Sequence, residues 1–109
     1  MPSPAIPAGG VIRVSRATFD PSRLAEVEQM LRDTSTYLSP AIGRLAGLLG
    51  YYAGASPEGS IVAVSLWGSD AQASQMGNLK EMTVDARKEA EAVGVSVPTI
   101  VNHPLVWQI

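Results

Sequence analysis

The stretch Ile61-Val62-Ala63-Val64-Ser65-Leu66-Trp67 decides the fold. β-branched and aromatic residues are frequent in it and neither Gly nor Pro interrupts it, which predicts a β-strand. Alternate side chains of a strand point to opposite faces, so Val62, Val64 and Leu66 share one face. The other face carries Ile61, Ala63, Ser65 and Trp67. Neither face is polar enough for water, whereas a half-solvated antiparallel strand alternates apolar with polar residues. The strand is therefore expected in a sheet covered on both faces.

The residues before this strand predict a β-hairpin. Leu48 to Ala55 forms a second candidate strand, and Ser56-Pro57-Glu58-Gly59-Ser60 is typical of the connecting turn. Tyr51 and Tyr52 must point to opposite faces because they are neighbours in a strand. The turn does not fix the hairpin register, so the sequence leaves open which tyrosine shares the face of Trp67.

A strand and a helix precede the hairpin. Val11 to Thr18 (VIRVSRAT) is rich in β-branched residues and predicts the first strand. Asp20 can cap a helix whose first position is Pro21, where no backbone hydrogen bond is lost. An apolar stripe at spacings of three and four continues to Leu38, and the helix is expected to end before Pro40.

A second helix and a last strand follow the hairpin. Ser69 with Gln72 three residues later forms a capping box at the helix start. One helical stripe then contains Met76, Leu79, Thr83, Ala86, Ala90 and Val93, and Gly94 is expected to end the helix. The last strand is expected over 99–109 at an edge of the sheet, because Pro104 has no amide hydrogen for a ladder.

The order of elements is β-α-β-β-α-β, which predicts the α+β class and a ferredoxin-like subunit. Its four strands are expected to form one antiparallel sheet with both helices on one face. Residues 1–10 contain three prolines and a Gly-Gly pair, so we expect a flexible N-terminal arm followed by a single domain over 11–109.

The sheet face without helices predicts a second subunit. Right-handed crossovers put both helices on the same side, which leaves roughly six to ten apolar side chains uncovered at about 1.5–3 kcal/mol each. An identical sheet related by a two-fold axis would cover them, so we expect a homodimer through the open sheet face. The alternative is a monomer with an unusually apolar surface.

Composition excludes several classes of function. Charged residues make up 17% of the 109 residues and the net charge is −2, so no basic face for nucleic acid is expected. The chain has no cysteine and one histidine, His103, which argues against a metal site. We find neither a membrane-spanning stretch nor a secretory signal, and we expect a cytoplasmic protein that does not bind membranes.

Trp67 indicates a candidate pocket; the alternative, which burial preferences of tryptophan favour, is that it fills core volume. It ends a strand whose same face carries the small residues Ala63 and Ser65, so space for a ligand is expected between sheet and helices. Arg13 and Arg16 project to opposite faces of the first strand, so one of them could meet an anionic ligand; the alternative, which the sequence favours, is that both are solvated charges at a strand end. A lone serine without a neighbouring base is not a nucleophile, and no catalytic residue stands out. The candidate pocket residues are Trp67, Ser15, Tyr52, Met76 and Leu79.

The order of elements together with Val64-Ser65-Leu66-Trp67-Gly68-Ser69 resembles the antibiotic biosynthesis monooxygenase group of dimeric α+β barrel proteins. The segment Gly47-Leu48-Leu49-Gly50-Tyr51-Tyr52 resembles the residues that lead into their second strand. The resemblance implies that Trp67 lines a pocket, and that Ser15 matches an asparagine of the haem-degrading members. Their haem-ligand histidine falls near Gly77, which has no imidazole, so haem degradation is not expected.

The resemblance implies two functions. One is cofactor-independent oxidation of an aromatic or quinone-like compound, which needs no cofactor because the substrate supplies the electrons. The alternative is a non-catalytic dimeric binding or interaction module whose pocket is filled. An open cavity of a few hundred Å³ beside Trp67, with converging polar groups, would favour the first.

Overall fold

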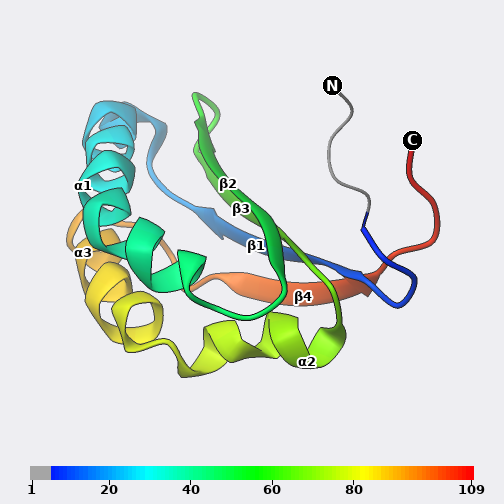
Figure 1. The fold of residues 1–109 in the computed structure, drawn as a ribbon. Coiled ribbons are helices and arrows are strands. Elements are labelled where there is room, and N and C mark those ends of the chain that lie inside the picture. Colours follow the sequence, from blue (N-terminus) through cyan, green and yellow to red (C-terminus); the bar gives the residue numbers. More distant parts are fainter. Residues whose placement is uncertain (1–5) are drawn as a thin grey trace.

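A computed structural model of the protein describes residues 6–109 and has the predicted α+β architecture (Figure 1). One antiparallel sheet has the strand order β2-β3-β1-β4, so β2 and β4 are its edges. The strands are β1 (Val11–Thr18), β2 (Leu48–Ser56), β3 (Ser60–Trp67) and β4 (Thr99–Pro104). The helical segments are α1 (Leu24–Gly43), α2 (Asp70–Ala73) and α3 (Arg87–Ala92), with the short helical turns η1 (Pro21–Arg23), η2 (Ser74–Asn78) and η3 (Glu81–Ala86).

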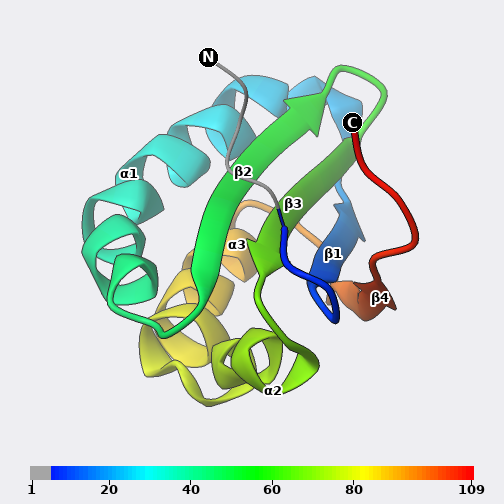
Figure 2. The same ribbon diagram turned by 45° about the vertical axis from the view of Figure 1, so that its right-hand side comes forward.

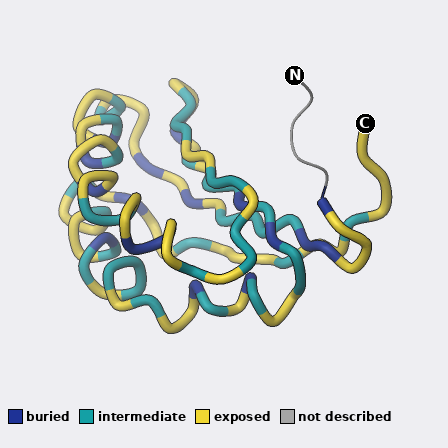
Figure 3. The backbone as a smooth tube through the Cα atoms, in the orientation of Figure 1, coloured by how far each residue is buried: buried dark blue, intermediate teal, exposed yellow. Residues whose placement is uncertain are grey.

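All helices lie on one side of the sheet, as predicted for right-handed crossovers. Figure 1 and Figure 2 show α1 and α3 side by side against this face, with α2 at one end of it. The hydroxyl of Tyr37 on α1 donates a hydrogen bond to Glu89 on α3, which links the two helices. Figure 3 shows exposed positions on the outer turns of the helices, at the hairpin tip and along the C-terminal segment.

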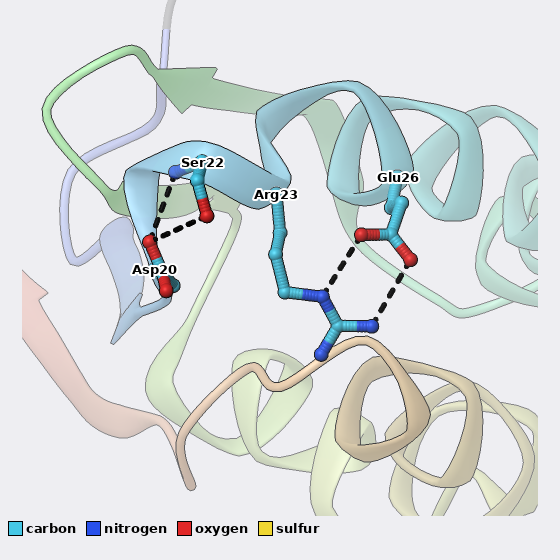
Figure 4. Close-up of polar contacts among 4 residues, drawn as sticks. All are labelled: Asp20, Ser22, Arg23 and Glu26. Carbon is cyan, nitrogen blue, oxygen red and sulfur yellow. Dashed lines mark hydrogen bonds and ion pairs between the residues drawn. The ribbon is translucent and has the colours of Figure 1, made fainter.

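The first helix starts as predicted and ends later than predicted. Asp20 accepts a hydrogen bond from the amide of Ser22 at 3.0 Å, and Arg23 forms an ion pair with Glu26 at 2.9 Å (Figure 4). The expected end before Pro40 is wrong, because α1 continues to Gly43. Ala41 and Ile42 are each only 3% exposed, and their burial offsets the backbone hydrogen bond that proline removes.

The second helix is not one continuous helix. Ser69 accepts a hydrogen bond from the amide of Gln72 at 3.2 Å, which confirms the predicted start. The chain then passes through α2 and η2 to an extended residue, Leu79, and resumes as the π-helical turn η3 before α3. Met76 and Met82, on either side of this break, both pack in the same core cluster. The break therefore lets both side chains face the sheet, which one regular helix does not do at a spacing of six residues.

The last strand is the expected edge strand, but it ends at Pro104 rather than at residue 109. Proline cannot donate to the ladder, so pairing with β1 stops there. Beyond it, the amide of Ile6 donates to the Gln108 side chain at 2.9 Å, and Gln108 donates back to the Ile6 carbonyl at 2.7 Å. Residues 1–5 of the expected arm lie outside the described residues, and the domain boundary stays a prediction.

The core consists of two clusters at opposite ends of the interface between sheet and helices. One cluster contains Val11 at the start of β1 and the other contains Ala17 near its end. The first also includes Ile42, Trp67, Ala73 and Met76, and the second includes Phe19, Val27, Met30 and Val95. The middle of β1, around Ser15, lies between the two clusters.

The opposite face of the sheet is apolar and carries no helix. Tyr52, Val64, Val14 and Val101 form one row of cross-strand neighbours on it. Tyr52 is 61% exposed and Val101 is 45% exposed. This is the uncovered apolar surface that the alternation in β3 predicts.

Candidate functional site

A cavity of about 730 Å³ lies between the helix face of the sheet and the helices. Its walls come from β1, β2 and β3 on one side and from α1 and the broken second helical segment on the other. Ala53 and Ile100, on the two edge strands, line the cavity and are also exposed. The cavity therefore opens to solvent along both edges of the sheet. A volume of this size accommodates a drug-sized ligand.

Three rows of cross-strand neighbours lie on the helix face of the sheet: two form the floor of the cavity, and an apolar row closes one end of it. The row of Leu48, Trp67 and Val11 is apolar and belongs to the first core cluster. The next row is polar and contains Tyr51, Ser65, Arg13 and Asn102. The third row contains Ala53, Ala63, Ser15 and Ile100. Its two alanines and one serine are small, which leaves the space above the sheet unfilled.

Trp67 forms a wall behind the cavity. It is fully buried, packs with Val11 and Met76, and is not among the residues that line the cavity. Its indole Nε1 donates a hydrogen bond to Ser65 Oγ at 2.8 Å. Ser65 lines the cavity, and because its oxygen already accepts this bond, its hydroxyl hydrogen is available to donate.

Arg13 is the only positive charge in the polar row. Its Nη1 donates to the amide oxygen of Asn102 at 3.0 Å, and the amide nitrogen of Asn102 donates to Asp70 at 3.1 Å. Burial lowers the pKa of Arg13, while Tyr51 and Asp70 act in the opposite direction. Burial likewise raises the pKa of Tyr51, partly countered by Arg13. At neutral pH the row therefore presents a charged guanidinium and a protonated phenol.

The roof of the cavity is mainly apolar. Met30, Leu31 and Leu38 of α1 face it, together with Thr34, whose hydroxyl donates to the Leu31 carbonyl at 3.3 Å. Met76 and Met82 line it from the second helical segment, on either side of the break at Leu79. Unbranched methionine side chains adapt to irregular shapes, so this roof can fit ligands of different outline.

The structure brings only some of the predicted pocket residues to the cavity. Ser15 and Met76 line it, whereas Trp67 and Leu79 pack behind the lining in the first core cluster. Tyr52 lies on the opposite sheet face. A register shift between Leu48 and Gly50 places Tyr51 beside Ser65, so Tyr51 replaces Tyr52 in the candidate site.

Other residues of the site carry weaker sequence signals. Arg13 shares the face of Ser15 because the two lie two residues apart on one strand, and Arg16 points to the opposite face. Asn102 joins the site only through the pairing of β4 with β1. Thr34 belongs to the apolar stripe of α1, so nothing in its spacing separates a cavity residue from a core residue.

The residues from 6 to 109 contain no group of three or more His, Cys, Asp or Glu side chains placed to hold a metal ion. His103 is exposed and pairs with Ile12, on the sheet face away from the cavity. None of the helices in this part of the chain is long and apolar enough to cross a membrane.

No protein-family model and no curated protein matches the chain. Solved structures do resemble it. A monooxygenase from the gene ActVA-Orf6 of Streptomyces coelicolor, in complex with Nanaomycin D, has a TM-score of 0.74 and 18% identity over 94% of this chain and 93% of that one. SnoaB, a cofactor-independent oxygenase from Streptomyces nogalater, has a TM-score of 0.65 and 16% identity over 94% and 98% of the two chains.

A dimeric ferredoxin-like protein from an uncultured marine organism has a TM-score of 0.63 and 15% identity, and 93% of this chain and 91% of that one are covered. Structures described as candidate antibiotic biosynthesis monooxygenases also share the fold. The fold is therefore the ferredoxin-like α+β fold of antibiotic biosynthesis monooxygenase-like proteins, which confirms the resemblance expected from the sequence. At these identities the likeness establishes the fold, and function has to be argued from the site.

Proposed function

We propose that this protein binds a flat, largely apolar aromatic or quinone-like compound in the cavity between its sheet and its helices. The observation that carries this proposal is the open volume of about 730 Å³, with mainly apolar walls and a polar row containing Arg13 on its floor. Ligand sites typically combine apolar walls with a few polar groups that orient the ligand. The small residues Ala53 and Ala63 leave room for a ring system to lie over the sheet.

The reaction that we propose for the site is cofactor-independent oxygenation. A ring CH₂ group of the substrate becomes a carbonyl, one oxygen atom of O₂ enters the product and the other leaves as water. The substrate supplies all four electrons, so the equation balances without an external reductant. Two structurally similar proteins, one a monooxygenase and one a cofactor-independent oxygenase, support this choice of chemistry.

The alternative is a non-catalytic binding module with a filled pocket. The open cavity argues against a filled pocket but is equally compatible with binding without turnover. Oxygen uptake separates the two functions, and an oxygen electrode measures it directly with a polycyclic substrate such as anthrone. Turnover that requires the folded protein supports the oxygenase, whereas ligand binding without oxygen uptake supports the binding module.

We also propose that two copies associate through the open sheet face. The row containing Tyr52, Val64 and Val101 leaves apolar side chains uncovered, each worth about 1.5–3 kcal/mol on burial. A structurally similar protein described as dimeric supports association into a dimer. The domain over 11–109 and the cytoplasmic location remain predictions.

Titration calorimetry with the neutral probe 2-methoxy-1,4-naphthoquinone tests the proposed binding site. The variant Ala63→Leu places a large side chain in the cavity and should weaken binding at least about tenfold, because the ring loses its space. Ala25→Leu is the matched control, since Ala25 is exposed on α1 and does not line the cavity. Equal loss in both variants, or no binding by the unmodified protein, would remove the proposal.

A further inference from the structure

We propose that the ligand of this cavity is an organic anion whose ionised oxygen binds Arg13 at the polar end, while its apolar ring body occupies the space over Ala53 and Ala63. This inference rests on the proposed function, because it names the chemical class of ligand for the same cavity. The ligand carries a charged oxygen at one end of an otherwise apolar molecule, for example an enolate, a phenolate or a carboxylate on an aromatic ring.

Arg13 is a charged group without a charged partner. Among residues 6–109 the ion pair within 4 Å is Arg23 with Glu26, and Arg13 has no carboxylate at that distance. Its one hydrogen bond goes to the neutral amide oxygen of Asn102. A guanidinium has five N–H donors, so most of them have no partner in this part of the chain. Arg13 is half-buried at the cavity, so an anion there would form charge-assisted hydrogen bonds with donors that no described residue uses.

The acidic residue nearest to Arg13 orients it without neutralising it. Asp70 accepts from the amide nitrogen of Asn102, which turns the amide oxygen of Asn102 toward Arg13. The amide therefore stands between the carboxylate and the guanidinium. These two hydrogen bonds orient the guanidinium, and its positive charge stays available to a ligand.

The other polar groups beside Arg13 are also donors. Ser65 Oγ accepts from Trp67 Nε1, so its hydroxyl hydrogen can point into the cavity. Tyr51 remains protonated because burial raises its pKa, and its hydroxyl is a third donor in the same row. Three donors in one cross-strand row, one of them charged, favour an acceptor that carries negative charge.

The charges elsewhere in the cavity do not supply this selectivity. Arg87 and Glu91 also line it, but both come from α3, away from the polar row of the sheet. They have opposite signs and Glu91 is exposed. Arg87 and Glu91 lie one helical turn apart on α3 and together bring no net charge, whereas the positive charge of the polar row comes from Arg13.

Two naphthoquinones of the same ring size test the inference. 2-Hydroxy-1,4-naphthoquinone is ionised at neutral pH, whereas 2-methoxy-1,4-naphthoquinone is neutral. By titration calorimetry the unmodified protein should bind the anion at least about tenfold more tightly than the neutral compound. Arg13→Gln should weaken binding of the anion at least about tenfold more than it weakens binding of the neutral compound, which removes the preference. Arg16→Gln, on the opposite sheet face, should change neither affinity.

The results distinguish the inference of an anionic ligand from the proposed function of binding an aromatic compound. If the neutral compound binds and the anion has no advantage, or if Arg13→Gln keeps the advantage, the inference is overturned and the proposed binding function stands. If neither compound binds, both fail. Arg13→Lys provides a second variant in case Arg13→Gln does not fold: it retains the charge and should keep part of the preference for the anion.

Discussion

Replacing Trp67 with Phe should lower the free energy of unfolding by about 1.5–3.5 kcal/mol. The indole Nε1 donates to Ser65, which is only 2% exposed, and phenylalanine has no donor to replace it. Loss of this buried hydrogen bond costs about 0.5–1.5 kcal/mol. Trp67 is fully buried, so the smaller ring also leaves a void in the first core cluster, at a further cost of about 1–2 kcal/mol.

Urea unfolding followed by far-ultraviolet circular dichroism measures this loss at one fixed protein concentration, because a dimer's stability depends on concentration. Trp107→Phe is the control: Trp107 is 74% exposed, and its replacement should change stability by less than about 0.5 kcal/mol. Equal stability of the Trp67→Phe variant and the unmodified protein would refute the role of Trp67 as a buried wall of the cavity. An equal loss in the Trp107→Phe variant would refute it as well.

Three further substitutions test other parts of the structure. Val64→Asp should convert the proposed dimer into a monomer in sedimentation experiments, whereas Val84→Asp, exposed on η3, should leave the association state unchanged. Gly59→Ala should lower the free energy of unfolding in urea by about 1–3 kcal/mol, because Gly59 has φ +95° and a Cβ there would lie 2.5 Å from the Phe19 carbonyl oxygen. Gly54→Ala is the control: a Cβ at Gly54 would have no atom within 4 Å, so the free energy of unfolding should stay within about 0.5 kcal/mol of that of the unmodified protein. Hydrogen bonds from Ser22 lower the pKa of Asp20, so its contribution to stability is present above its unfolded-state pKa of about 4 and is lost as the pH falls through the folded-state value. Asp20→Asn should therefore flatten the acid limb of a plot of thermal stability against pH, and an unchanged slope would contradict the assignment of that cap.

The side-chain alternation of β3 was sufficient to predict the two faces of the sheet. It placed Ser65 and Trp67 on the helix side, and the strand order places Ser15 beside Ala63 on the same face. The cavity follows from the same pattern, because small side chains at positions 63 and 65 do not fill the layer between sheet and helices.

The remaining features depend on contacts that are distant in sequence. The irregular register near Leu49 decides that Tyr51 faces the cavity, and local residue preferences do not encode it. The continuation of α1 past Pro40 depends on the burial of Ile42 against the sheet. The orientation of Arg13 depends on Asn102, which is 89 residues away along the chain. Each of these features is decided by packing or pairing between elements, so a local pattern alone does not reveal it.

The most direct test of the cavity is an amide chemical-shift map with 2-methoxy-1,4-naphthoquinone added to isotope-labelled protein. Binding in the space between sheet and helices should shift the amides of Ser15, Ala63, Ser65 and Thr34, all of which belong to cavity-lining residues. Shifts confined to the opposite sheet face, or no shifts at saturating probe, would contradict the account.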